Sequence, residues 1–96
     1  MRDYELLCLL PPDVDEERTE AVLARVRGSL EGQGGVVEKV DLWGKRRLAY
    51  EINGHRDGVY VLLTFKAGPQ ALRELERVLG LTDDVVRHVV VRLDGE

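Results

Sequence analysis

The apolar residues of the chain recur with two spacings, one typical of strands and one typical of helices. Residues 3–10 (DYELLCLL) form a short apolar run that two prolines end, because proline cannot donate to a strand ladder. In residues 14–33 the apolar side chains recur every three or four positions, as on one face of a helix. Asp13 and Asp15 are candidate N-caps, and Asp13 has capping-box spacing to Glu16. The pattern therefore predicts a strand followed by a helix.

The rest of the pattern predicts three more strands and one more helix. Residues 36–52 (VVEKVDLWGKRRLAYEI) alternate between apolar and polar positions, which is typical of a half-buried strand. Gly44 in the middle of this run predicts a bulge or a bend. Residues 53–58 (NGHRDG) are turn residues that lead into a strand over 59–66. A helix over 69–80 and a last strand over 85–93 complete the series.

This order of elements, β-α-β-β-α-β, predicts an α+β fold of the ferredoxin-like type. Two βαβ units with right-handed crossovers leave room for one strand between each parallel pair. We therefore expect a four-stranded antiparallel sheet in the order 4-1-3-2, with both helices on one face. The 96 residues fit a single domain, 1–96, without a linker.

Three of the predicted strands are apolar at both parities, although two helices can cover only one face of a sheet. A sheet with one wet face is expected to alternate cleanly, and a contiguous apolar surface often marks a partner site. The alternative to a partner site is a few scattered exposed apolar residues, which are common on protein surfaces. If Leu6, Cys8, Val61 and Leu63 face the helices, the partner-binding candidates on the open face are Leu7, Leu9, Tyr60 and Leu62.

The charge of the chain is unevenly distributed. Lysines and arginines number 14 against 18 acidic residues, so the net charge of −4 argues against a non-specific nucleic-acid binder. The run Lys45-Arg46-Arg47 is nevertheless basic and follows Trp43. Strand alternation would place Lys45 and Arg47 on the side of Trp43 and Arg46 on the other. Basic groups beside an aromatic ring suit RNA recognition, but they also protect an outer strand from aggregation, and the residues leave both readings open.

Catalytic and metal chemistry is poorly supported, so we expect no enzyme activity, no metal and no cofactor. Cys8, His55 and His88 are not at the spacing of metal ligands. Cys8 reads as a small buried hydrophobe, His55 as a solvated turn residue and His88 as a structural histidine. A single cysteine, with neither a signal peptide nor a membrane-length apolar run, predicts a cytoplasmic protein.

Several short motifs lie along the chain, and the long one in the middle is the most specific. They are Met1-Arg2-x-Tyr4-Glu5, Pro12-Asp13, Gly34-Gly35-x-Val37, Val40-Asp41-Leu42-Trp43-Gly44-Lys45-Arg46-Arg47-Leu48-Ala49-Tyr50-Glu51-Ile52, Gly58-x-Tyr60 and Arg87-His88-x-Val90-Val91-Arg92. From end to end, these motifs resemble the bacterial small-subunit ribosomal protein six family.

The resemblance implies a structural, non-catalytic protein of the small ribosomal subunit in the cytoplasm. It implies a ferredoxin-like fold that binds 16S ribosomal RNA together with small-subunit ribosomal protein eighteen. Tyr60 and Leu62 then lie on the partner side. The candidate RNA contacts are Arg2, Lys45, Arg46, Arg47 and Arg92. Two rival classes are a ferredoxin-like regulatory domain that binds a ligand or forms homodimers, and a small acyl-phosphate hydrolase. The hydrolase would need an arginine-bearing anion loop where this chain has Pro11-Pro12-Asp13.

Overall fold

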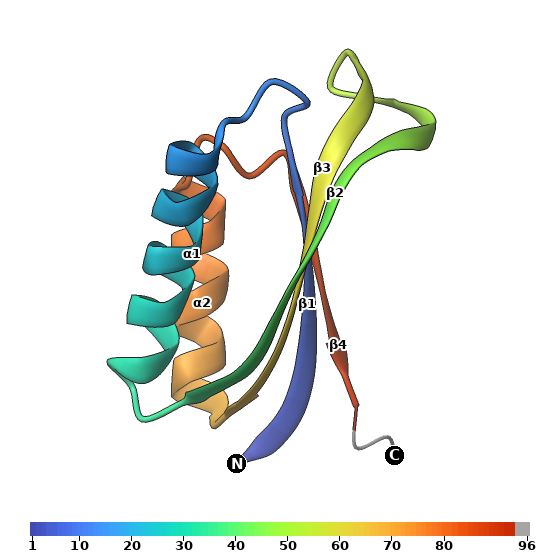
Figure 1. Cartoon of the computed structure of the whole chain (residues 1–96). Helices are drawn as coiled ribbons and strands as arrows, with labels where there is room; N and C mark the ends of the chain where they lie inside the picture. The colour runs from blue at the N-terminus through green and yellow to red at the C-terminus, as the bar shows by residue number, and fades with distance from the viewer. Residues whose placement is uncertain (94–96) are drawn as a thin grey trace.

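The structure is a computed structural model that describes residues 1–93, so residues 94–96 of the predicted domain lie outside the described part. The elements follow the predicted order, and both helices lie on the same side of the sheet (Figure 1). Their bounds are β1 Arg2–Leu10, α1 Glu16–Glu31, β2 Val36–Ile52, β3 His55–Ala67, α2 Pro69–Leu81 and β4 Arg87–Arg92.

The four strands form one antiparallel sheet in the spatial order β2-β3-β1-β4. Read from the other edge, this is the predicted order 4-1-3-2. The two central strands are β3 and β1, of which β1 pairs with both β3 and β4, and the edges are β2 and β4. The predicted ferredoxin-like fold class is therefore confirmed.

The hydrophobic core lies between the sheet and the helices. Leu6 pairs with Leu63 and Cys8 pairs with Val61, and each of the four is at most 1% exposed. They therefore have the predicted parity. Burying an aliphatic side chain of this size contributes roughly 1.5–3 kcal/mol. The helices fill the other side of the core with Val22, Leu23, Val26, Leu30, Ala71, Leu75 and Leu79.

The helices begin where the chemistry of their first residues allows. Asp15 is the N-cap of α1, and its Oδ1 accepts a hydrogen bond of 2.8 Å from the backbone N–H of Arg18. The other candidate, Asp13, does not cap the helix, so α1 starts two residues later than predicted. Pro69 occupies the first turn of α2, where its missing N–H costs nothing.

The hairpin between β2 and β3 is tighter than predicted. Only Asn53 and Gly54 form the turn, with φ of 48° and 82°, which is the two-residue loop that Asn-Gly favours. His55 already pairs with Ile52. The predicted turn over 53–58 is wrong, because residues 55–58 are polar but belong to β3 and extend the hairpin.

The long strand β2 is irregular, as the glycine within it predicted. Its register against β3 shifts in three places, and Gly44 at one of them has a φ of 78°. The predicted burial of alternate residues is wrong in this strand, since Leu42 and Tyr50 are 57% and 64% exposed. The reason is that the far half of the hairpin curves away from the helix layer (Figure 1).

Candidate functional site

The face of the sheet opposite the helices carries the predicted apolar residues. Leu7 pairs with Leu62, and Leu9 pairs with Tyr60. Side chains of directly paired residues lie on the same face, and their strand neighbours face the core. All four partner-binding candidates therefore lie together on the open face.

Two further apolar residues of this face come from β4. Val89 pairs with Leu7 and Val91 pairs with Glu5, and these valines are 42% and 48% exposed. Val90 between them packs against the core. The valine run is apolar at both parities, so only the register of β4 decides which residues are outside. We call Leu7, Tyr60, Leu62, Val89 and Val91 the open-face patch.

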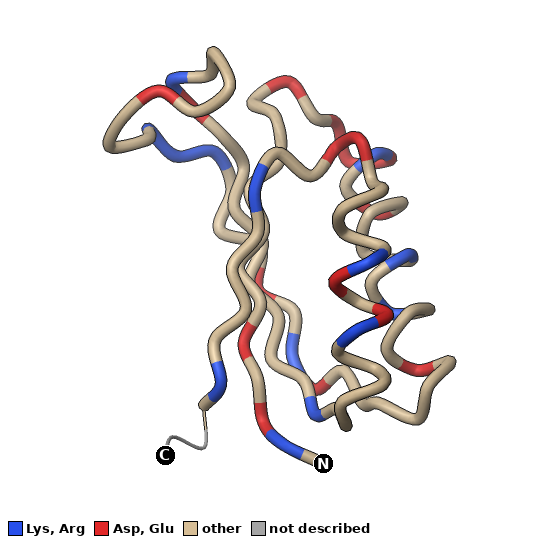
Figure 2. The backbone as a smooth tube through the Cα atoms, turned by 180° about the vertical axis from the view of Figure 1, so that it is seen from behind, with Lys and Arg blue, Asp and Glu red and all other residues tan. Residues whose placement is uncertain are grey.

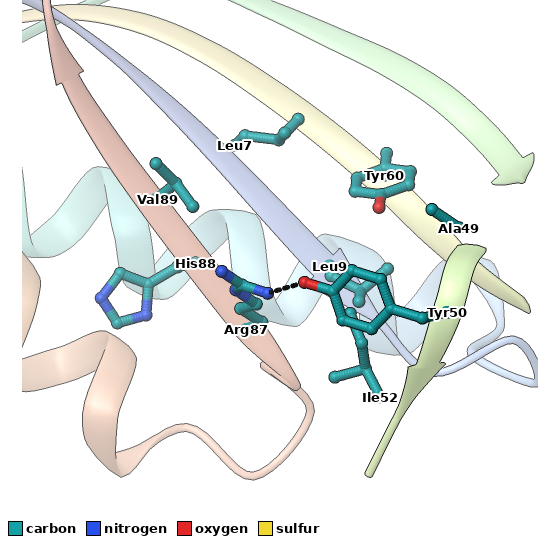
Figure 3. A pocket seen from close by; sticks show the side chains of 9 residues that line it. All are labelled: Leu7, Leu9, Ala49, Tyr50, Ile52, Tyr60, Arg87, His88 and Val89. Atoms are coloured by element: carbon teal, nitrogen blue, oxygen red, sulfur yellow. Dashed lines mark hydrogen bonds between the residues drawn. The ribbon is translucent and has the colours of Figure 1, made fainter. Parts of the chain in front are cut away.

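Leu9 lies on the open face but is only 3% exposed. The far end of the hairpin covers it, and the ring of Tyr50 lies beside it (Figure 3). Together they border a concavity of about 220 Å³. Leu9 is thus covered by its own chain, whereas Leu7, Tyr60 and Leu62 remain half-buried. The lining residues are Leu7, Leu9, Ala49, Tyr50, Ile52, Tyr60, Arg87, His88 and Val89.

The predicted basic segment, Lys45, Arg46 and Arg47, is exposed in the far half of β2. Within residues 1–93, no carboxylate forms an ion pair with any of the three. Arg46 donates one hydrogen bond from Nε to the carbonyl oxygen of Trp43, at 3.3 Å. Figure 2 shows this segment as a basic stretch on the side of the sheet away from the helices.

The bulge in β2 changes the neighbours of Trp43. The prediction assumed a regular strand, in which Trp43 would share a face with Lys45 and Arg47. The bulge makes Trp43 an extra residue, and its ring lies 6.2 Å from that of Tyr60, tilted by 55°. The register also places Arg46 on the side of Tyr60. The predicted grouping is therefore wrong, because strand parity reverses across a bulge.

The other two candidate RNA contacts lie at the opposite end of the sheet. Arg2 and Arg46 pair with Ala67 and Gly58 of β3, respectively. Those two positions are about 30 Å apart at 3.3 Å per residue. Arg92 pairs with Tyr4, two residues after Arg2, so it lies at the same end of the sheet as Arg2. The structure thus separates the five predicted contacts into two groups.

Cys8 and His88 are paired residues on the helix side of the sheet. Cys8 is buried in the core, as predicted, and burial raises the pKa of its thiol to about 12, which leaves it inert as a nucleophile. His88 Nε2 lies 3.5 Å from Oε2 of Glu76, so this histidine faces α2. Over residues 1–93 no cluster of His, Cys, Asp and Glu could hold a metal ion, and no helix could cross a membrane.

Comparisons with known proteins agree along the whole chain. The family model described as Ribosomal protein S6 matches residues 3–92. The small ribosomal subunit protein bS6 of Carboxydothermus hydrogenoformans is 49% identical over 94 residues, 98% of each chain. That of Clostridium novyi is 53% identical over 91 residues, 95% of this chain and 96% of the relative. The crystal structure of 30S ribosomal protein S6 from Thermotoga maritima matches with a TM-score of 0.89 at 33% identity, over 97% of this chain and 88% of that one.

Proposed function

The chain belongs to the ribosomal protein S6 family of the small ribosomal subunit, and we propose that it binds 16S ribosomal RNA jointly with small-subunit ribosomal protein eighteen. One observation carries the proposal: the open-face patch lies beside the exposed basic segment Lys45–Arg47. A protein partner on the patch would therefore lie next to RNA held by the basic segment. The proposed role is structural and not catalytic.

The patch has the composition that protein partners recognise. The half-buried leucines and exposed valines are contiguous across β3, β1 and β4, and apolar surface of this kind is costly to leave in water. Trp43 and Tyr60 meet at its edge with Arg46 beside them. Tryptophan, tyrosine and arginine are the residues that most often dominate binding energy at protein interfaces.

The basic segment suits contacts to the phosphate backbone. No set of base-reading side chains accompanies Lys45, Arg46 and Arg47 along the strand, so they position the protein without selecting a sequence. Three cations on a chain of net charge −4 provide little affinity alone. If the partner supplies further cations, the joined phosphate contacts add in one binding event.

Salt dependence tests the RNA contacts. With the partner present, the variant in which Lys45, Arg46 and Arg47 are all alanine should bind 16S ribosomal RNA more weakly. Its log–log salt slope should fall by about 0.7–0.9 for each lost phosphate contact. The matched control replaces three exposed arginines of the helices, namely Arg25, Arg27 and Arg73. Equal slopes in the two variants would refute the RNA role of the basic segment. The pair Arg2 and Arg92, replaced separately, tests the second group.

A charge on the open face tests the partner site. Leu62→Asp should abolish binding of small-subunit ribosomal protein eighteen in titration calorimetry, and should change thermal stability little, because Leu62 faces away from the core. Leu81→Asp is the control, since Leu81 is 65% exposed on the helix layer. Normal binding by Leu62→Asp would refute the open-face site. Unfolding of this variant would instead mean that Leu62 belongs to the core.

The rival class, a ligand-binding or homodimerising regulatory domain, predicts different results. The concavity of about 220 Å³ is smaller than the roughly 300–1,000 Å³ of ordinary small-molecule sites. A homodimer through the open face would be disrupted by Leu62→Asp in sedimentation without RNA or partner. Co-sedimentation of the wild-type chain with small ribosomal subunits would favour the ribosomal function over the regulatory domain and over the acyl-phosphate hydrolase.

A further inference from the structure

The two edge strands of the sheet touch, although two other strands lie between them. Arg87, at the start of β4, donates a hydrogen bond of 3.1 Å from Nη1 to the hydroxyl oxygen of Tyr50, near the end of β2. The sheet order β2-β3-β1-β4 places these strands at opposite edges. In a flat sheet, edges three strands apart are about 14 Å from each other. The contact therefore crosses the open face over β3 and β1, through two long side chains and a hairpin end that curves toward that face (Figure 1).

Packing beneath the hairpin end supports this bend. Tyr50 and Ile52 from β2 border the same concavity as Leu9 from β1 (Figure 3). Leu9 is 3% exposed, although its register places it on the open face. The hydrogen bond between Tyr50 and Arg87 lies at the rim of this contact (Figure 3), so apolar packing and one polar contact hold the hairpin end from the same side.

The bent hairpin is also the element that carries the basic segment. Lys45, Arg46 and Arg47 lie between the bulge at Gly44 and Tyr50 on the same strand. This half of the hairpin curves away from the helix layer (Figure 1). A two-stranded ribbon without packing is only marginally stable in water. Contacts at Tyr50 therefore limit the directions in which the three cations can point.

We propose that Tyr50 and Arg87 are positioning residues for RNA binding: they clasp the hairpin end onto β4 and hold the basic segment in its binding orientation. The proposal rests on the RNA-binding function proposed above. The clasp itself touches no RNA. Its benefit is preorganisation, because cations held in place before binding lose less conformational freedom when RNA arrives.

Tyr50→Phe is the test, because it keeps the ring over Leu9 and removes only the hydroxyl acceptor. Two measurements are compared with the wild type: amide hydrogen exchange of residues 45–58, and affinity for 16S ribosomal RNA over a salt series with the partner present. We expect faster exchange in the hairpin and RNA binding weakened by about fivefold, the typical effect of one hydrogen bond. The salt slope should stay unchanged, because no phosphate contact is removed.

Arg87→Ala separates the clasp from a direct contact of this arginine with RNA. If Arg87 acts only through Tyr50, then Tyr50→Phe has no additional effect on affinity in the Arg87→Ala background. Tyr4→Phe is the control, since it removes a tyrosine hydroxyl on the helix side of β1, where the ring stacks on Phe65. This control should leave hairpin exchange unchanged.

Three results would overturn the positioning role. They are unchanged hairpin exchange in Tyr50→Phe, faster exchange with wild-type RNA affinity, and a lower salt slope, which would mean a lost phosphate contact. If the wild-type protein with its partner does not bind the RNA at all, the proposed function fails and the positioning role fails with it. In that case the exchange measurement still reports whether the clasp holds the hairpin.

Discussion

Gly58 lies where the hairpin passes close to Leu9 and Leu10 of β1. A methyl group there would lie 2.3 Å from Leu9 Cδ1 and 3.1 Å from the carbonyl oxygen of Leu10, both shorter than ordinary van der Waals contact. Leu9 is 3% exposed beneath the hairpin end, and its Cγ also lies 3.2 Å from that methyl group, so more than the tip of the side chain would have to move. We therefore expect Gly58→Ala to force a shift of Leu9 and of the strand itself.

The expected cost of Gly58→Ala is the difference between two effects. Overpacking by one methyl group against a buried side chain and a backbone carbonyl costs about 1–3 kcal/mol. The φ of Gly58 lies outside the left-handed region, so alanine also reduces the freedom of the unfolded chain and returns about 0.4–1 kcal/mol. The free energy of unfolding should therefore fall by roughly 1–2 kcal/mol, and Tm by about 4–8 °C per kcal/mol.

Urea unfolding of Gly58→Ala, Leu9→Ala and the double variant measures this clash directly. Without the Leu9 side chain, the methyl group loses its closest contact, so Gly58→Ala should cost less in the Leu9→Ala background. Gly28→Ala is the control in the opposite direction. It adds a methyl group to α1 with no atom within 4 Å, and should stabilise the protein by about 1 kcal/mol. An equal cost of Gly58→Ala in both backgrounds would refute the close approach over Leu9.

Three further predictions concern single groups. Arg18 hydrogen-bonds to Asp84 and lowers the pKa of that carboxyl below its usual 3.8. The pair therefore contributes stability above that pH, and this contribution is lost as pH falls through the lower pKa of the folded state. In Asp84→Asn, the free energy of unfolding should depend less on pH in the acid range. An unchanged dependence would contradict this reasoning. Because burial raises the pKa of Cys8 to about 12, an aromatic disulfide reagent at pH 8 should label the folded protein only at its rate of opening, and fast labelling without urea would place Cys8 outside the core. Gly44→Ala should destabilise the protein by about 1–2 kcal/mol through its positive φ, and Gly44→Asn by less; equal loss in thermal melts would contradict that reasoning.

The order of elements and the core could be predicted from the sequence because regular strands alternate strictly. Once Leu6 is assigned to the helix side, Cys8 and their β3 partners Val61 and Leu63 follow. The apolar spacing of both helices fixes their buried faces in the same way. These predictions depend only on neighbours along one chain segment and on the pairing of two regular strands, so they needed no knowledge of how the sheet bends.

The errors of prediction concentrate in β2 and its hairpin, where alternation is interrupted. Gly44 indicates a bulge, but the sequence does not show which residue is the extra one. Trp43 is that residue, so the prediction groups it with the wrong cations. Leu9 was predicted to be available to a partner, yet it is covered by Tyr50 from the other edge of the sheet. Contacts between two edges depend on accumulated twist and bending, which no local pattern of residues records.

The separation of charge by face explains how a chain of net charge −4 can present a basic surface. The hairpin region and the start of β4 carry five cations and two carboxylates, a balance of +3, so the remaining residues carry −7. The acidic start of α1 lies on the helix side, and the basic segment lies beyond the sheet on the other side (Figure 2). Packed layers of secondary structure are about 10 Å apart, and the screening length at physiological salt is about 8 Å. The acidic helices therefore weaken the basic surface little at contact distance, but they remove most of the long-range attraction for RNA.

A protein with this distribution of charge gains affinity chiefly from contacts made after docking. Binding then changes most with a partner that adds cations and with a clasp that holds the cations of the hairpin in place. The charged residues counted in the hairpin region (45–58) and at the start of β4 are Lys45, Arg46, Arg47, Glu51, Arg56, Asp57 and Arg87.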